Sequence, residues 1–126
     1  MKPLPILLVG LGGFAGAVAR FAINTAVGAR LGGGWPWATF LINLSGCFAI
    51  GFFFAFAAER AGLSENWRYL FPVGFVGAYT TFSTYAYETV RMVDEGAWLR
   101  ALAYVTLSTV LGFAAVVAAM ALARRF

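Results

Sequence analysis

A short segment in the second half of the chain concentrates side-chain hydroxyls inside an apolar stretch. Residues 74–85 read GFVGAYTTFSTY, and four of the five positions from 80 to 84 carry Thr or Ser. Such hydroxyls compete for backbone hydrogen bonds, and glycines just before them weaken a helix. We therefore expect a helix break near Gly77–Ser83, where freed carbonyls could bind Na⁺ and hydroxyls could face an anion. Hydroxyls that bond back to their own helix are the alternative, which explains one or two of the four.

Polar residues at helical spacing occur in two other apolar stretches. Asn43 lies four residues after Thr39, and Ser108 lies four residues after Tyr104. Residues four apart share one face of a helix. The Asn43 amide offers two N–H donors to an anion, although an Asn in a membrane bonds neighbouring helices about as often. Tyr104 and Ser108 have the same two interpretations.

Two aromatic residues, one within the hydroxyl cluster and one just after it, share one predicted helix face. Phe82 and Tyr85 are three positions apart. The edge of an aromatic ring carries the positive end of its quadrupole, so an edge can approach an anion favourably. Aromatic residues at this spacing more often pack in a core, so the pair supports an anion path only together with the polar residues around it.

Charged residues are nearly absent from the apolar stretches. Arg20 lies deep in the first one, where it either extends to the nearer interface or supplies a fixed positive charge. Glu88, near the end of the third stretch, is the only acid inside any of them. The chain has no histidine and one cysteine, Cys47, which excludes an intrachain disulfide and a Cys/His metal site. Proton pumping and acid–base or Ser-His-Asp catalysis are disfavoured for the same reason, so we do not expect an enzyme.

The composition indicates a membrane protein. Of the 126 residues, 62% are hydrophobic and 11% are charged, against about 45–50% and about 25% in soluble domains. The aromatic content of 17% also excludes a disordered chain. These values leave too little polar surface for a protein folded in water.

Charge-free stretches predict four transmembrane helices in a single domain over residues 1–126. About 20 apolar residues are needed to cross the membrane, and the stretches suggest helices near 4–28, 36–58, 69–90 and 98–123. Outer-membrane strands would alternate polar and apolar residues, whereas residues 47–54 read CFAIGFFF. All four tryptophans fall at starts of the predicted spans, where the membrane interface favours them. Small residues four apart predict close helix contacts: Gly12/Gly16, Gly74/Ala78 and Ala115/Ala119/Ala123.

The basic residues are almost balanced between the two membrane sides. Both termini and the middle loop share one side, with Lys2, Arg60, Arg68, Arg124 and Arg125. The other side has Arg30, Arg91 and Arg100, with Arg20 closest to it. The positive-inside rule needs a clear excess to fix orientation, so we expect insertion in both orientations and pairing of opposed copies as an antiparallel homodimer. The basic residues are not clustered as nucleic-acid binding requires.

Three blocks of the sequence resemble the bacterial fluoride channels of the Fluc (CrcB) family. They are GGFAGAVAR at residues 12–20, NLSG at residues 43–46, and GAYTTFST at residues 77–84 with Glu88 after it. The resemblance spans three of the predicted helices, and the TTFST segment is its most specific part. It implies a dual-topology homodimer in the bacterial inner membrane that exports fluoride passively from the cytoplasm. It also implies two pores at the subunit interface.

The resemblance also implies roles for individual residues. A structural Na⁺ at the dimer centre would bind the backbone carbonyls of Gly77 and Thr80. The residues expected along the fluoride path are Asn43, Phe82, Tyr85, Tyr104 and Ser108, with Glu88 near a pore end, and Thr39 and Ser83 join them through their hydroxyls. Arg20 is expected to act electrostatically or structurally. Fluoride is small and strongly hydrated, so these donors would replace its water, and a narrow path would reject larger anions.

The chain departs from the family pattern at two positions. Tyr85 stands where the family usually has Phe, and Ala78 replaces a common glycine. A hydroxyl adds a donor and bulk, so we expect Tyr85 to keep the fold while changing fluoride throughput.

Two other functional classes compete with the channel. A small multidrug transporter is also a four-helix dual-topology dimer, but the resemblance to that class implies a membrane glutamate in the first helix, where this chain has only Arg20. An assembly subunit without transport activity would use its polar residues only to hold helices together, which the hydroxyl cluster argues against.

Overall fold

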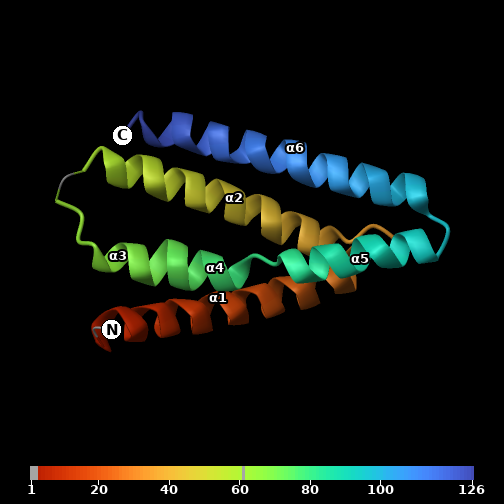
Figure 1. Ribbon diagram of the computed structural model, residues 1–126, viewed down its shortest axis with the longest axis horizontal. Coiled ribbons are helices and arrows are strands. Elements are labelled where there is room, and N and C mark those ends of the chain that lie inside the picture. Colours follow the sequence, from red (N-terminus) through yellow and green to blue (C-terminus); the bar gives the residue numbers. More distant parts are fainter. Residues whose placement is uncertain (1–2, 61) are drawn as a thin grey trace.

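The structure is a computed structural model that describes residues 3–60 and 62–126. Its helices follow one another as α1 (Pro3–Arg30), α2 (Trp37–Ala58), α3 (Asn66–Arg68), η1 (Tyr69–Val76), α4 (Gly77–Tyr79), α5 (Phe82–Asp94) and α6 (Trp98–Ala123). They form four long rods that run back and forth along one axis (Figure 1). The described residues contain no strand, so the expectation of an all-helical chain is confirmed.

Three of the helices are long and apolar enough to cross a membrane. These are α1, α2 and α6, with 28, 22 and 26 residues. At 1.5 Å per residue even the shortest exceeds the roughly 30 Å hydrocarbon core. The fourth rod consists of α3, η1, α4 and α5 in succession over residues 66–94 (Figure 1). Four helical segments therefore lie within a few residues of the predicted spans, three of them long and apolar enough to cross a membrane, and the third segment is the broken one.

The third span is irregular from its start. Tyr69–Val76 form a π-helix with Pro72 inside it. Proline has no N–H to donate to the carbonyl four residues earlier, and wider π turns are one way in which a helix adapts to this. The glycines and hydroxyls of this span predict a weakened helix, but they do not predict the π-helix.

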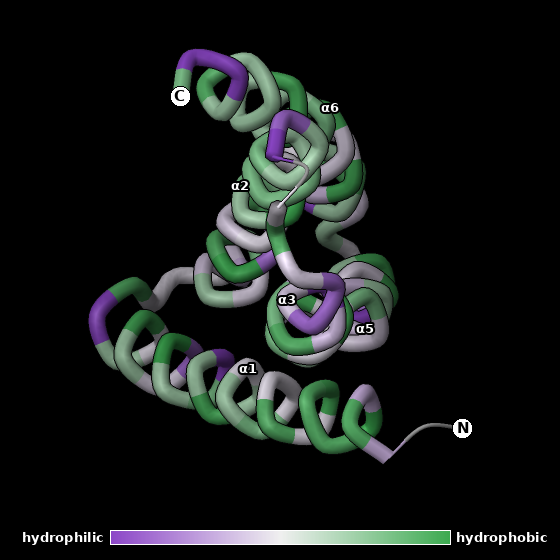
Figure 2. Tube along the Cα trace, turned by 90° about the vertical axis from the view of Figure 1, so that its left-hand side faces the viewer, coloured by the Kyte–Doolittle hydropathy of each residue, from purple (hydrophilic) through white to green (hydrophobic). Residues whose placement is uncertain are grey.

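Glycines bring two helices into backbone contact, as their spacing predicts. A Cβ atom at Gly12 or Gly16 would overlap the backbone of Leu70 or Phe75. A Cβ at Gly74 would lie 2.8 Å from the carbonyl oxygen of Val9. Helix α1 thus packs directly against η1 and α4, whereas α2 packs mainly along α6. In Figure 2, which looks along the molecule from one end, α1 extends below the other spans and is tilted relative to them.

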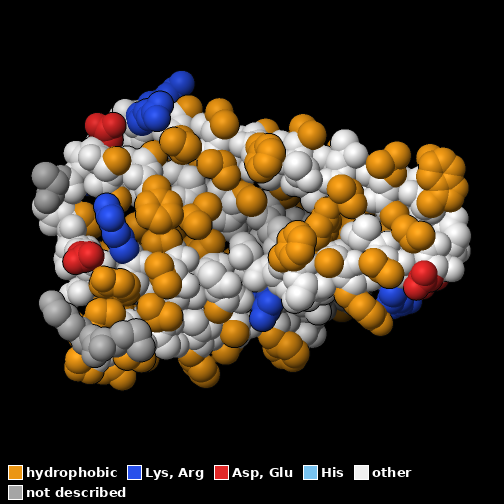
Figure 3. Space-filling model, viewed as in Figure 1, with side chains coloured by type: hydrophobic (Ala, Val, Ile, Leu, Met, Phe, Trp, Pro, Cys, Tyr) orange, Lys and Arg blue, Asp and Glu red, His pale blue; other side chains and the backbone are white. Residues whose placement is uncertain are grey.

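The loops sit at two ends of the molecule, as the alternation of spans requires. At one end Arg60 Nη2 donates to the main-chain oxygen of Phe126, at 3.3 Å, so the middle loop and the C-terminus are adjacent. At the other end Arg100 Nη1 donates to the carbonyl of Gly34, also at 3.3 Å. Lys2, which the charge balance includes, lies outside the described residues. Figure 3 shows hydrophobic side chains over most of one face, with most charged side chains near its two ends.

Candidate functional site

The third span breaks within the predicted segment. Thr80 (φ −75°, ψ 159°) and Thr81 (φ −149°, ψ 113°) are extended, and they separate α4 from α5. The Thr80 hydroxyl bonds back to the carbonyl of Val76 at 3.0 Å. The Thr81 hydroxyl instead caps α5, because it accepts from the Thr84 N–H at 3.3 Å. The Thr80 hydroxyl therefore bonds back to its own helix, as in the alternative interpretation. The Thr81 hydroxyl instead forms the N-cap of the next helix.

Three hydroxyls form a small network at this cap. Thr81 Oγ1 donates to Thr84 Oγ1 at 3.0 Å, and Ser83 Oγ lies 3.4 Å from Thr81 Oγ1. Ser83 itself is exposed on the protomer. The Ser83 side chain, which is predicted on the ion path, is thus accessible from outside the protomer. Its hydroxyl already lies within hydrogen-bond distance of the Thr81 hydroxyl.

The Asn43 amide holds the broken backbone. Its Oδ1 accepts from the Thr81 N–H at 2.8 Å, and its Nδ2 donates to the Thr81 carbonyl at 3.0 Å. The pair resembles the two bonds that a neighbouring β-strand would supply to an extended residue. The Asn43 side chain therefore acts partly as a bond between α2 and the break. One N–H of its amide remains for another acceptor.

These bonds leave the carbonyls before the break without their helical partners. In a continuous helix the Gly77 carbonyl would accept from Thr81, and the Thr80 carbonyl would accept from Thr84. Here the Thr81 N–H donates to Asn43, and the Thr84 N–H donates to the Thr81 hydroxyl. Gly77 is also exposed on the protomer surface. These two carbonyls are the ones that the sequence analysis expected to face a cation.

A groove of about 300 Å³ runs beside the break between α2, α5 and α6. It is lined by Asn43, Cys47, Phe82, Tyr85, Ser108, Thr109, Gly112 and Phe113. Four of the predicted path residues thus line one continuous surface, on which Phe82 and Tyr85 have ring centroids 5.7 Å apart. Phe82 is 80% exposed on the protomer, so it does not pack in a core of this chain. Gly112 and Phe113 are not predicted from the sequence, because neither side chain carries a polar group.

Ser108 is the unusual polar group in this groove. Its Oγ is buried and has no hydrogen-bond partner among the described residues. Buried hydroxyls are nearly always paired, because an unpaired one costs stability. The Ser108 hydroxyl is therefore available to an acceptor that the described residues do not supply.

A second polar cluster lies toward the C-terminal end of α5. The Glu88 carboxylate accepts from Thr39 Oγ1 at 2.8 Å and from the Tyr104 hydroxyl at 2.9 Å. Tyr104 is fully buried, and its ring centroid lies 5.1 Å from that of Tyr85. The cluster thus joins α2, α5 and α6 and adjoins the groove through the two tyrosine rings. All four residues are predicted on the path from the sequence, whereas the two bonds to Glu88 are not.

Arg20 is set apart from this arrangement. It is half-buried on α1 and is not among the residues that line the groove or that contact the Glu88 cluster. Arg20 therefore makes no direct contact with the predicted path within the described protomer. Its predicted electrostatic or structural role does not rest on such a contact.

Comparison with known proteins gives one consistent match. Residues 7–120 match the family described as CrcB-like protein, Camphor Resistance (CrcB). The chain is 44% identical over 119 residues to a protein of Solibacter usitatus named fluoride-specific ion channel FluC, covering 94% of this chain and 98% of that protein. It is 42% identical over 118 residues to the FluC protein of Koribacter versatilis, covering 94% of each. It is 48% identical over 106 residues to FluC 2 of Moorella thermoacetica, covering 84% of each.

Proposed function

The chain belongs to the CrcB-like family, and on that premise we propose that it is a fluoride-selective channel. Its relatives are named as fluoride-specific ion channels, and the family is one of channels rather than enzymes. The observation in this chain that carries the proposal is the groove, which gathers Asn43, Phe82, Tyr85 and Ser108 from three helices. The match gives no support to the alternative of a proton-coupled multidrug transporter, and α1 has no acid between Pro3 and Arg30.

The donors along the groove suit a small, strongly hydrated anion. Fluoride can leave its water only where hydrogen-bond donors replace it. The free N–H of Asn43 and the unpaired hydroxyl of Ser108 are two such donors, and the edges of Phe82 and Tyr85 add positive quadrupole. Beyond Tyr85 the path continues to the hydroxyl of Tyr104 at Glu88. We place Thr39 and Ser83 at the margins of this path.

The open side of the groove is where we place a second copy of the chain. Phe82 and Gly77 are exposed on the protomer, although they adjoin its most polar backbone. Unpaired backbone groups at membrane depth require protein or a cavity around them. An antiparallel homodimer would cover this face and form two equivalent pores between the subunits. The near balance of basic residues at the two ends is consistent with the two opposite insertions that such a dimer needs.

Na⁺ is the cofactor that the break best fits. The carbonyls of Gly77 and Thr80 have lost their helical donors, and oxygen ligands are what a hard cation prefers. One chain offers too few ligands, so the same two carbonyls of a partner chain would complete the site. The ion would hold the two breaks together and supply a positive charge between the pores.

The remaining assignments concern location and direction. Three long apolar helices and a broken fourth span make the chain a multi-pass membrane protein. We place it in the bacterial inner membrane, where a passive path lets fluoride leave the cytoplasm down its gradient. The consequence would be a lower fluoride concentration in the cell.

Fluoride efflux from liposomes tests the proposal. Purified protein is reconstituted with KF inside, and efflux is started with a K⁺ ionophore, alongside liposomes that contain KCl. We expect rapid release of fluoride and negligible release of chloride. Equal release of both anions, or no release from liposomes shown to contain folded dimer, would contradict the assignment.

Ser108→Ala separates ion conduction from structure. The Ser108 hydroxyl has no partner in the described chain, so its removal should leave stability unchanged or slightly higher. If the hydroxyl serves the ion, fluoride efflux should still fall. Thr25→Ala is the matched control, because the exposed Thr25 hydroxyl bonds only to the Phe21 carbonyl of its own helix. Unchanged efflux in Ser108→Ala would remove Ser108 from the path.

A further inference from the structure

A charged pocket lies at the end of the molecule where α5 turns into α6. It has a volume of about 230 Å³ and is lined by Gly34, Trp35, Pro36, Glu88, Arg91, Met92, Glu95 and Arg100. We call it the end pocket. Glu88, on its wall, also accepts the hydroxyls of Thr39 and Tyr104. Glu88 therefore belongs both to the end pocket and to the polar cluster that adjoins the groove.

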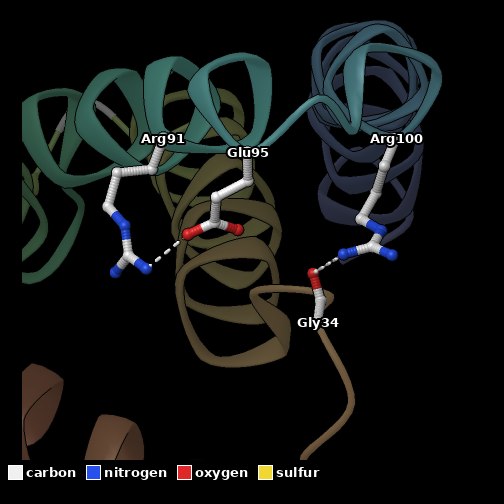
Figure 4. Close-up of polar contacts among 4 residues, drawn as sticks. All are labelled: Gly34, Arg91, Glu95 and Arg100. Atoms are coloured by element: carbon white, nitrogen blue, oxygen red, sulfur yellow. Dashed lines mark hydrogen bonds and ion pairs between the residues drawn. The ribbon is translucent and has the colours of Figure 1, made fainter.

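The two arginines of the end pocket have different partners. Arg91 Nη2 and Glu95 Oε1 are 2.6 Å apart on successive turns of α5, and both side chains are more than half exposed (Figure 4). Their charges offset each other within the pair. Arg100, from α6, reaches across to the carbonyl of Gly34, which carries no formal charge (Figure 4). Arg100 therefore forms no ion pair with another residue of the end pocket, and no carboxylate there neutralises its positive charge by direct contact.

The loop before α2 is shaped around the Arg100 guanidinium. Gly34 has φ +82°, and a Cβ atom there would lie 2.6 Å from Arg100 Nη1. Glycine adopts this backbone conformation without strain. The guanidinium of the exposed Arg100 thus lies against the Gly34 backbone, and up to four of its five N–H groups remain for other acceptors.

The formal charges of the end pocket sum to zero with Arg100 in place. Glu88 and Glu95 contribute two negative charges, and Arg91 and Arg100 contribute two positive ones. Without Arg100 the pocket would carry one net negative charge, next to the carboxylate that a fluoride ion must pass. A net negative charge at such a constriction repels anions and lowers their local concentration.

We propose that Arg100 makes the end pocket a mouth for anions, because its fixed charge offsets Glu88 where fluoride approaches the polar cluster. The proposal rests on the proposed function, since it assigns a mouth to that same path. A unit charge at contact distance in water changes the local concentration of a monovalent ion roughly threefold to fivefold. The effect should vanish in concentrated salt, where the screening length falls to about 3 Å.

Arg100→Gln tests the proposal through its dependence on salt. Efflux is measured at one fluoride concentration, with ionic strength raised by an impermeant salt from about 20 mM to about 1 M, which shortens the screening length from roughly 20 Å to about 3 Å. We expect efflux about three to five times below that of the unmodified protein at low ionic strength, and equal efflux at high ionic strength. Arg100→Lys should behave as the unmodified protein. A reduction of the same size at every ionic strength, or none at any, would overturn the proposal.

The charge-neutral control is the double variant Arg91→Gln, Glu95→Gln. It removes two charges of the same pocket without altering their sum, so its efflux should match the unmodified protein at both ionic strengths. If this variant lost as much efflux at low salt as Arg100→Gln, charge balance would not be the cause and the proposal would fail.

A second measurement does not depend on fluoride conduction. Pro36, on the pocket wall, is replaced by Cys in a Cys47→Ser background, and the thiol reacts with anionic and cationic methanethiosulfonates of similar size. Because Arg100 attracts one reagent about threefold and repels the other about threefold, the anionic-to-cationic rate ratio should fall about tenfold when Arg100→Gln is added. An unchanged ratio refutes the charge effect. A changed ratio without any fluoride efflux would instead refute the proposed function alone.

Discussion

Replacement of Asn43 by Ala should release the extended backbone at Thr81. The Asn43 amide forms two hydrogen bonds to this residue, at 2.8 Å to its N–H and at 3.0 Å to its carbonyl. The methyl group of Ala can form neither of them. The two Thr81 groups would then lie part-buried at membrane depth without the partner that holds them in the extended conformation.

The size of the effect follows from these two groups. A buried backbone group that loses its partner costs about 1–3 kcal/mol. Asn43 lines an open groove, so water in the solubilised protein can partly replace the amide, and each group should cost about 1–1.5 kcal/mol. We therefore expect a loss of about 2–3 kcal/mol in the local stability of the break.

Amide hydrogen exchange at Thr81 measures this loss directly. Exchange of a bonded N–H requires local opening, whose free energy sets the protection. A loss of about 2–3 kcal/mol corresponds to exchange roughly 30 to 150 times faster. In Asn43→Asp the carboxylate can still accept from the Thr81 N–H but cannot donate to its carbonyl, so an intermediate increase is expected.

Thr89→Val is the matched control for this experiment. The Thr89 hydroxyl bonds only to the Tyr85 carbonyl of its own helix, at 2.8 Å, so its loss should leave exchange at Thr81 within about twofold. If Asn43→Ala also left the Thr81 N–H within about threefold of the unmodified protein, its protection would not come from Asn43. The account of the break as held by α2 would then be wrong.

Three further predictions concern packing, throughput and the polar cluster. Gly16→Ala should destabilise the protein by at least about 2 kcal/mol, because its Cβ would overlap the Phe75 backbone. Gly28→Ala, with nothing within 4 Å, should be neutral or stabilising by up to about 1 kcal/mol; equal unfolding midpoints in detergent for the two variants would contradict the close contact of α1 with η1. Tyr85→Phe should leave the fold intact and change the rate of fluoride efflux, and an unchanged rate would show that the Tyr85 hydroxyl does not act on the ion. Glu88→Gln should lower the free energy of unfolding by about 1–2 kcal/mol, because one amide oxygen replaces two carboxylate oxygens that accept from different hydroxyls. An unfolding curve in urea or detergent that matches the unmodified protein would exclude a structural role for that pair of bonds.

The sequence predicted the spans well because their ends are marked by local features. Charge-free stretches of about 20 residues have few conformations available in a bilayer, and the expected span at 98–123 coincides with α6. The break was also predictable, since glycines and hydroxyls weaken a helix wherever they occur. The π-helix before it was not, because Pro72 is equally compatible with a kink, a turn or a helix end.

The pairings at the site could not be derived from the sequence alone. Asn43 bonds to the backbone of Thr81, 38 positions away, and a backbone group is present at every position, so its residue type gives no signal. The contacts of Glu88 with Thr39 and Tyr104 depend on how three helices are rotated about their axes. Helical spacing shows which residues share a face, but it does not show which face meets which neighbour.

One bond connects the cation site and the anion path in these proposals. The Thr81 N–H is the donor that the Gly77 carbonyl would receive in a continuous helix, and Asn43 Oδ1 accepts it instead. The same interaction orients the Asn43 amide, whose remaining N–H belongs to the groove. A variant in which Thr81 bonds back to Gly77 would therefore lose a cation ligand and displace an anion donor together. For this reason we expect substitutions of Asn43 to weaken Na⁺ binding as well as fluoride efflux, whereas Ser108→Ala should affect efflux alone.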